Sequence, residues 1–192
     1  MRVAILLAAG RSRRFVGANK LLARVGGAAI VTHAVRVARA APVARVIVVT
    51  GHDHVRVARA VRGPRVRVVH ARAHRAGVSA SLRAGITALW PVERAIYVFL
   101  GDMPTVPPSL VRRQARALVP GVAAVRTRGR AGPGNPVLLR RPDADVVARL
   151  TGDRGFAPLI IGKIRWIDAG GGQPMDVDTR YDLSRLRRDA MG

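Results

Sequence analysis

Apolar positions gather in short blocks along the chain, and polar positions separate these blocks. The apolar run from Val3 to Leu7 predicts a buried parallel strand near the start of the chain. Further strands are predicted at residues 45–50, 66–69, 95–100, 122–126, 136–139 and 164–168. Residues 95–100 (AIYVFL) are apolar throughout, so we expect this strand at the centre of a sheet.

Helical patterns lie between these strands. Residues 28–41 place apolar side chains at helical spacing and end before Pro42. A further helix is predicted after the strand at residues 45–50 and ends at about residue 61. Others are predicted over residues 79–89, 107–118 and 143–150, and Ser79 is a candidate N-cap of the first of these. Alternating strands and helices predict an α/β fold of three layers, a Rossmann-like, mostly parallel sheet with helices on both faces. We expect residues 1–192 to form one domain.

Composition limits the class of protein. No stretch has the length and hydropathy of a membrane span, and the N-terminal apolar run has no signal-peptide cleavage pattern. We therefore expect a cytoplasmic protein without a membrane partner. The chain has no cysteine, which excludes disulfides, thiolate metal sites and cysteine nucleophiles.

The net charge of +23 raises the possibility of nucleic-acid binding. However, all basic residues except Lys20 and Lys163 are arginines, scattered over predicted helices and loops as in proteins from GC-rich genomes. Aromatic residues, on which single-stranded bases stack, make up only 4% of the chain. The charge favours small anionic ligands, and we expect no specific nucleic-acid partner.

The segment Leu7–Leu22, LAAGRSRRFVGANKLL, joins the first strand to a loop of small residues. Small side chains let backbone N–H groups approach anionic oxygens, and Arg14 and Lys20 add direct charge pairing. These features predict a triphosphate-binding loop. The spacing matches neither a Walker loop nor the Rossmann glycine fingerprint, so an ordinary strand-to-helix turn is the alternative.

Two acidic segments are candidate metal ligands. Asp102 follows the central strand in Gly101-Asp102-Met103-Pro104, where a carboxylate could hold Mg²⁺ beside the loop after the first strand. Its alternative role is to cap the next helix. Asp176 and Asp178 alternate on one side of an extended segment, which requires a cation or a basic partner between them. An arginine partner, or capping of the last helix by Thr179 or Asp182, would also explain this segment.

The segment GVSASLRAG, residues 77–85, places two hydroxyl groups at the start of a helix. Gly77, Ser79 and Ser81 could offer donors to a ribose, a base edge or a phosphate. Helix capping by Ser79 would explain one of the two serines. The five histidines have no metal-ligand spacing, and packing is the expected role for each; His52 and His54 are the one pair to test.

These motifs resemble a known family. The segments LAAGRSRRF, GVSASLRAG, LGDMP, GNPVLL, LTGDRG and DVDT occur in the same order in molybdenum cofactor cytidylyltransferases, which are glycosyltransferase-A-like nucleotidyltransferases. The resemblance runs from about residue 3 to about residue 183. It implies transfer of CMP from CTP to the phosphate of the molybdopterin cofactor, with release of pyrophosphate.

The resemblance also implies roles for individual residues. Arg14, Lys20 and Asp102 would be catalytic, and Asp102 and Asp178 would bind Mg²⁺, or Mn²⁺ in its place. Asn135 and Asp153 would bind the acceptor, and a molybdenum hydroxylase apoenzyme would be a possible partner. The nucleotide would be bound by Ala8, Ala9, Gly10, Ser12, Arg14, Lys20, Gly77, Ser79, Ser81 and Gly101.

Other functions stay open at this stage. A guanylyltransferase using GTP is the nearest, although it usually carries Leu-Ala-Gly-Gly where this chain has LAAG. Another sugar-phosphate or methylerythritol-phosphate nucleotidyltransferase, a non-catalytic accessory protein of a molybdenum hydroxylase and a basic nucleic-acid-binding module are further alternatives. The chain departs from the family's pattern at Val16, an extra residue, and at Phe156-Ala157, where Ala-Arg is usual.

Overall fold

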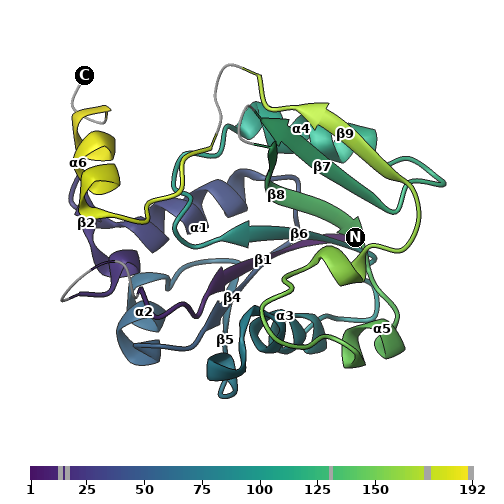
Figure 1. Cartoon of the computed structure of the whole chain (residues 1–192), viewed down its shortest axis with the longest axis horizontal. Coiled ribbons are helices and arrows are strands. Elements are labelled where there is room, and N and C mark those ends of the chain that lie inside the picture. The colour runs from purple at the N-terminus through teal and green to yellow at the C-terminus, as the bar shows by residue number, and fades with distance from the viewer. Residues whose placement is uncertain (13–14, 16–17, 130–131, 171–173, 190–192) are drawn as a thin grey trace.

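A computed structural model describes residues 1–12, 15, 18–129, 132–170 and 174–189 of the chain (Figure 1). Seven strands form one sheet in the order β5-β4-β1-β6-β8-β7-β9. Their bounds are β1 Arg2–Ala8, β4 Val46–Thr50, β5 Val66–His70, β6 Ala95–Leu100, β7 Ala124–Gly129, β8 Gly132–Arg140 and β9 Ile164–Asp168. Two short strands, β2 (Arg24–Val25) and β3 (Ala28–Ala29), form a separate hairpin.

The helices alternate with the strands along the chain. The α-helices are α1 Ile30–Ala40, α2 His54–Ala60, α3 Val78–Thr87, α4 Pro108–Ala117, α5 Ala144–Ala148 and α6 Arg180–Asp189. Three short 3-10 helices are η1 Lys20–Leu22, η2 His74–Ala76 and η3 Ala157–Leu159. None of the described helices is both long and apolar enough to cross a membrane.

The sheet is parallel except at β8. Strand β6 pairs with β1 in parallel, β8 pairs antiparallel with both β6 and β7, and β7 pairs with β9 in parallel. Strands β7 and β9 therefore run in the same direction as β1 and β6. The carboxyl ends of all the parallel strands meet at one edge of the sheet, which is where ligands bind in open α/β sheets.

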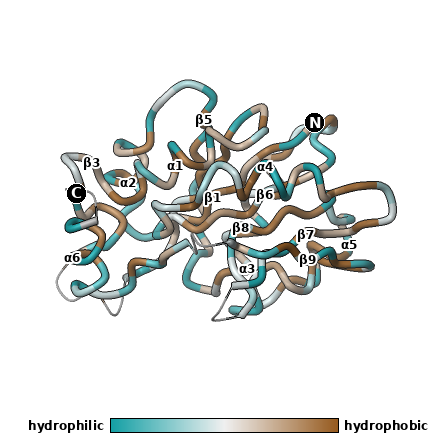
Figure 2. The backbone as a smooth tube through the Cα atoms, turned by 90° about the horizontal axis from the view of Figure 1, so that it is seen from above, coloured by the Kyte–Doolittle hydropathy of each residue, from teal (hydrophilic) through white to brown (hydrophobic). Residues whose placement is uncertain are grey.

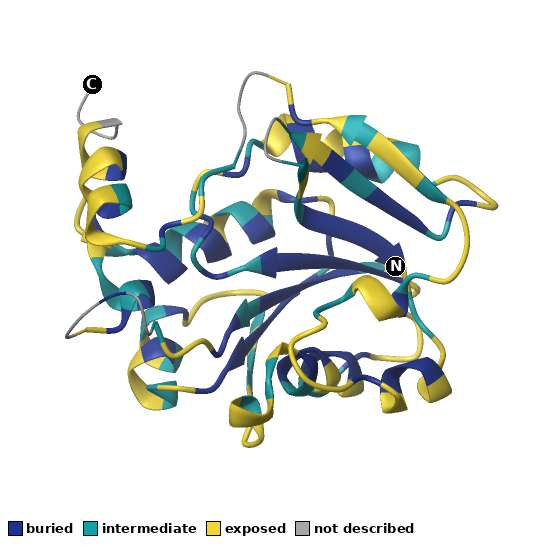
Figure 3. Cartoon of the chain, viewed as in Figure 1, coloured by how far each residue is buried: buried dark blue, intermediate teal, exposed yellow. Residues whose placement is uncertain are grey.

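Each face of the sheet has its own apolar core, because alternate strand residues point to opposite faces. On one face, β1 and β6 residues such as Leu6 and Phe99 pack with α1, α2 and α4; on the other, Ile5 and Val98 pack with α3 and α5. Figure 2 shows apolar residues along the central strands, and Figure 3 shows that these strands are buried. The predicted three-layer α/β fold is confirmed.

The C-terminal segment packs against the start of the chain. Val177, Leu183 and Leu186 form a small core with Phe15, Val25 and Ile30. At the start of α6, Asp182 Oδ2 accepts hydrogen bonds from the Thr179 backbone N–H at 2.8 Å and from the Asp178 N–H at 3.1 Å. The Asp182 N–H donates to Thr179 Oγ1 at 3.2 Å, so Thr179 and Asp182 form a capping box, as one of the sequence alternatives had it. These contacts hold Asp178 at a defined place.

A buried ion pair joins β4 to the segment before β6. Arg45 Nε donates to Glu93 Oε1 at 2.7 Å and Arg45 Nη2 donates to Glu93 Oε2 at 2.9 Å. The Trp90 N–H donates to Glu93 Oε2 at 2.7 Å, and the Arg45 guanidinium stacks on the Trp90 ring. Burial raises the pKa of Glu93, but the hydrogen bonds from Arg45 and Trp90 outweigh it and lower that pKa below its ordinary value.

Most predicted elements are present with ends shifted by a few residues. The helix expected at 28–41 begins at Ile30, because residues 28–29 belong to the hairpin. The turn of this hairpin is Gly26-Gly27, with φ of +53° and +78°. A Gly-Gly dipeptide favours tight hairpin turns and could have predicted the hairpin. Helix α3 begins at Val78, before the expected N-cap Ser79.

Candidate active site

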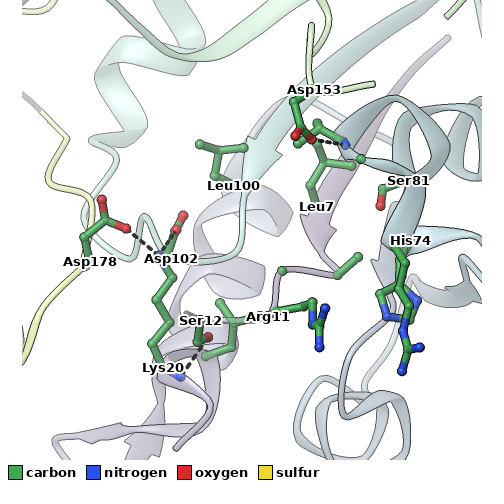
Figure 4. A pocket seen from close by; sticks show the side chains of 16 residues that line it. Leu7, Arg11, Ser12, Lys20, His74, Ser81, Leu100, Asp102, Asp153 and Asp178 are labelled. Atoms are coloured by element: carbon green, nitrogen blue, oxygen red, sulfur yellow. Dashed lines mark hydrogen bonds and ion pairs between the residues drawn. The ribbon is translucent and has the colours of Figure 1, made fainter. Parts of the chain in front are cut away.

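A cavity of about 470 Å³ lies at the carboxyl edge of the sheet (Figure 4). Its walls come from the loop after β1, the end of β6, the start of α3 and the segments around Asp153 and Asp178. Its volume is within the range of small-molecule sites. It is lined by Leu7, Ala9, Gly10, Arg11, Ser12, Lys20, Leu21, His74, Arg75, Gly77, Val78, Ser81, Leu100, Asp102, Asp153 and Asp178.

Lys20 connects two carboxylates in this cavity. Its Nζ lies 2.6 Å from Asp102 Oδ2 and 2.7 Å from Asp178 Oδ1 (Figure 4). The Val177 N–H donates to the Asp102 backbone carbonyl at 3.0 Å, and this hydrogen bond holds Asp178 near Asp102. Lys20, which lies 158 residues away in the chain, is thus a basic partner of Asp178, as expected for the Asp176-Asp178 segment.

The two carboxylates suit a divalent cation. Burial lowers the pKa of Lys20, but the charges and hydrogen bonds of Asp102 and Asp178 outweigh it and raise that pKa, so the ammonium stays charged. Asp102 Oδ1 is buried and has no hydrogen-bond partner among the described residues. Mg²⁺ and Mn²⁺ need few protein carboxylates when phosphate and water oxygens complete the shell. No described cluster of three or more His, Cys, Asp or Glu residues could hold a metal by itself.

The loop after β1 is shaped by Ser12 and Asn19. Ser12 has a φ of +51°, and its Oγ accepts a hydrogen bond from the Lys20 N–H at 3.1 Å and donates to Asn19 Oδ1 at 3.3 Å. Asn19 Oδ1 also accepts from the Leu21 N–H at 3.0 Å, which makes Asn19 the N-cap of η1. Asn19 was not among the predicted site residues, although an Asn before a helical turn is a recognisable cap. Arg14 and Val16 lie outside the described residues.

The start of α3 is capped by a distant carboxylate. The Val78 N–H donates to Asp153 Oδ1 at 3.0 Å, and the Ser79 N–H donates to the Gly152 carbonyl at 3.1 Å. Gly77 has a φ of +107°, and an added Cβ would lie 2.5 Å from the Gly152 oxygen. Glycine is therefore required at position 77 for the close approach of the two segments.

The predicted site residues separate into two groups. Ala9, Gly10, Ser12, Lys20, Gly77, Ser81, Asp102, Asp153 and Asp178 all line the cavity. Ala8, Ser79 and Gly101 do not: Ala8 is buried, and the Gly101 N–H donates to the Leu7 carbonyl at 2.9 Å. Ser79 is also buried, and its hydroxyl donates to the Thr151 carbonyl at 3.0 Å.

Asn135 and Asp153, both expected at the acceptor, line different cavities. Asn135 lines a smaller one of about 230 Å³, together with Thr127 of β7 and Asp176. Asn135 Oδ1 is buried without a hydrogen-bond partner among the described residues. Desolvation, together with the charges of Asp102 and Asp178, raises the pKa of Asp176 to about 6. Asp176 and Asp178, expected on one side of the segment, thus reach different cavities.

The histidines are not all remote from the cavity. His74 lines it, and its Nδ1 lies 3.1 Å from the Ala71 carbonyl. The His54 ring stacks on His70, with 4.1 Å between centroids, and His54 Nδ1 lies 2.7 Å from Thr50 Oγ1. His54 thus packs against His70, and this contact agrees with the packing role expected for the histidines.

The comparison with known proteins agrees with this geometry. Residues 4–165 match the family described as the MobA-like NTP transferase domain. The chain belongs to this family. As a MobA-like NTP transferase it is a nucleotidyltransferase by class, which confirms the coarser part of the resemblance.

Three solved structures of two relatives illustrate the relationship. The MobA-like chain is 30% identical to Rv0371c of Mycobacterium tuberculosis H37Rv, with 97% of each chain covered and a TM-score of 0.83. Rv0371c has also been solved as a complex with manganese, with 29% identity and a TM-score of 0.79 over 97% of this chain and 98% of the other. A nucleotidyl transferase from Methanothermobacter is 27% identical, with 100% and 98% of the two chains covered and a TM-score of 0.83.

Among curated proteins, the MobA-like chain is 27% identical to the bifunctional protein GlmU of Burkholderia ambifaria over 155 residues. The match covers 80% of this chain and 34% of the relative. The chain thus spans about a third of the length of the curated relatives that it matches.

Proposed function

We propose that the protein transfers CMP from CTP to the terminal phosphate of the molybdopterin cofactor, in one nucleotidyltransferase domain formed by residues 1–192. One observation carries the proposal: the small-residue loop and the carboxylates of Asp102 and Asp178 border the same cavity, and Lys20 joins them. A triphosphate over the loop would have its phosphates beside these carboxylates.

The nucleotide is held by groups from two elements. Ala9 and Gly10 present backbone to the cavity, and an added Cβ at Gly10 would meet no atom within 4 Å, so a phosphate has room to approach. Ser81 supplies a hydroxyl for the ribose or base, and Lys20 pairs with the phosphates. Arg14, outside the described residues, adds a second cation in this proposal. Ala8, Ser79 and Gly101 act behind the cavity wall as packing for the loop and α3.

Asp102 and Asp178 hold a divalent cation, Mg²⁺ or Mn²⁺. The unpartnered Asp102 Oδ1 supports this role, because a buried carboxylate oxygen without a donor is costly. The manganese complex of the relative Rv0371c supports it as well. When bound, the cation neutralises charge that develops on the phosphates.

The chemistry needs no covalent intermediate on the protein. An oxygen of the acceptor phosphate forms a bond to the α-phosphorus of CTP, the bond from that phosphorus to the bridging oxygen breaks, and its electron pair leaves with pyrophosphate. The attacking phosphate monoester is already anionic, so no general base is required. The residues of the cavity align the two reactants and stabilise negative charge on the leaving pyrophosphate, with Lys20 as one charged donor.

Pyrophosphate release tests the proposal. The protein with CTP, molybdopterin and Mg²⁺ is expected to release pyrophosphate, and Asp102→Asn to lose at least 100-fold in kcat. Asp145→Asn is the matched control, because Asp145 is an exposed carboxylate whose described ion pair is with Arg149 on the same helix turn. Equal loss in both variants, or full activity of Asp102→Asn with an intact fold, would contradict the metal-ligand role.

A panel of nucleotides and acceptors tests the specificity. We expect CTP to support turnover at least tenfold better than GTP, and molybdopterin to be preferred over sugar phosphates and methylerythritol phosphate. Nucleotide binding without turnover of any acceptor would instead indicate an accessory protein serving a molybdenum hydroxylase. We also propose a cytoplasmic location, which fractionation of the source cells would test.

A further inference from the structure

Two arginines and a tryptophan lie together near the end of β7 and β9. Arg126 and Arg128 alternate on β7 and therefore point to the same face of the sheet, and Arg126 pairs in register with Trp166 of β9. The guanidinium carbons of Arg126 and Arg128 lie 5.0 and 5.1 Å from the centre of the Trp166 ring. Phe156 borders the group, with its ring centre 5.4 Å from the Arg126 guanidinium. We call Arg126, Arg128 and Trp166 the arginine–tryptophan cluster.

No described carboxylate forms an ion pair with the cluster, although Asp168 is the register neighbour of Arg128 on β9. Neither guanidinium forms a hydrogen bond or ion pair with a described residue, and Arg126 Nε is buried without an acceptor. Burial lowers the pKa of Arg126. The two guanidinium groups lie against one aromatic ring, and Arg126 Nε has no acceptor. An anion that accepts hydrogen bonds from both arginines would therefore stabilise the cluster.

The cluster faces the same edge of the sheet as the candidate active site. β7 runs parallel to β6, so Arg126 and Arg128 approach the edge at which Asp102 follows β6. One strand, β8, lies between β7 and β6. At the usual strand spacing, the backbones of β6 and β7 are therefore about 10 Å apart. Phe156 also links the cluster to the cavity, because it follows Asp153, which lines the cavity, by three residues.

We propose that the arginine–tryptophan cluster binds a second anionic group of the acceptor, apart from the phosphate that attacks the nucleotide. This inference rests on the proposed nucleotidyl transfer and narrows its acceptor to molecules that carry a second anionic group besides the attacking phosphate. Arg126 and Arg128 donate hydrogen bonds to the second group, and Trp166 keeps the two guanidinium groups in place. An acceptor with the attacking phosphate alone would lack these contacts and bind more weakly.

Tryptophan fluorescence gives a test that does not depend on turnover. The chain has two tryptophans, so Trp166 is the only one left in a Trp90→Phe variant. Titration of this variant with inorganic phosphate, against chloride at equal ionic strength, is expected to change the Trp166 emission in a saturable way. Arg126→Met and Arg128→Met, each added to that variant, should weaken the apparent phosphate affinity at least tenfold, and Arg126→Lys should weaken it less.

Two controls separate the cluster from general charge and from the catalytic cavity. Arg59→Met removes one exposed arginine on α2, and Lys20→Met removes the cation of the cavity; both should leave the Trp166 response to phosphate unchanged. Circular dichroism and melting temperature establish that each variant is folded. A Trp166 emission that phosphate does not alter, or that it alters equally in Arg126→Met, would overturn the proposal.

Steady-state kinetics then connect the cluster to the reaction. With molybdopterin as the acceptor, the dithiolene is the second anionic group, so Arg126→Met should raise the acceptor KM at least tenfold and leave the CTP KM within twofold. If phosphate binds to the cluster but the protein shows no turnover, the anion site is supported and the proposed reaction is refuted. If Arg126→Met turns over with an unchanged acceptor KM, the role of the cluster is refuted and the proposed reaction is supported.

Discussion

Substitution of Gly85 by alanine tests how α3 is positioned above the sheet. Gly85 lies in the interior of α3, where alanine is normally the better helix former by about 1 kcal/mol. An added Cβ would, however, lie 2.8 Å from Ile5 Cγ2 and 3.0 Å from Val49 Cγ2. Both methyl groups belong to fully buried side chains of β1 and β4, so neither can move aside at low cost.

The steric effect should exceed the helix-propensity gain. Overpacking of a well-packed core costs about 1–3 kcal/mol, and two rigid contacts at 3.0 Å or less favour the upper end. With about 1 kcal/mol regained from helix propensity, Gly85→Ala should lower the free energy of unfolding by about 2 kcal/mol. For a chain of this size that corresponds to a fall in Tm of about 4–8 °C. Because α3 also carries Ser81 into the cavity, nucleotide affinity should fall as well.

Urea unfolding of a double-mutant cycle measures the contact itself. Ile5→Ala removes the methyl group that Cβ would meet, at its own cost of about 2–5 kcal/mol. In that background Gly85→Ala should cost less than in the unaltered protein, and the coupling energy should be favourable. A Tm for Gly85→Ala equal to or above that of the unaltered protein would refute the reasoning, since helix propensity would then dominate.

Three further predictions concern single residues. Gly77→Ala should weaken CTP binding at least tenfold in calorimetric titration, because its Cβ would lie 2.5 Å from the Gly152 oxygen at a φ of +107°; unchanged affinity would contradict this. Lys20→Met should tighten Mn²⁺ binding measured by electron paramagnetic resonance without nucleotide, because two carboxylates lose their cation; equal or weaker binding would count against it. Glu93 should make stability depend on pH: its folded pKa lies below the ordinary value of 4.5, so its contribution is complete above pH 4.5 and disappears as the pH falls through the folded pKa. Urea unfolding from pH 7 to pH 3 should show this loss, and Glu93→Gln, which keeps the shape beside Arg45, should not show it.

The elements of the fold could be predicted from the chain because their signals are local. The apolar run at residues 95–100 is a central strand, and the proline-containing start of α4 was expected within one residue. The hairpin of β2 and β3 was missed because two strands of two residues carry almost no periodic pattern. The helix start at Val78 differed from the expectation because its cap is Asp153, a residue of another segment.

Part of the candidate site could be predicted because its signals are also local in the sequence. Residues 7–22 and Asp102 could be found because each stands directly at a strand end, and strand ends of a parallel sheet share an edge. Ser79 and Ser81 are two residues apart and could not be told apart by sequence, yet one hydroxyl is buried against Thr151 and the other faces the cavity. Rotation of α3 against the sheet, set by its packing, decides between them.

The sequence by itself determined the strands of the main sheet, most of the α-helices, the layered α/β class and the small-residue loop, because hydropathy periods and turn residues act over a few positions. Only the tertiary structure decided which distant groups meet: Lys20 with Asp178, Asp153 with α3, and Arg126 with Trp166. Each of these contacts depends on the order and direction of the strands in the sheet, which arise from packing over the whole chain and leave no local pattern in the residues that touch.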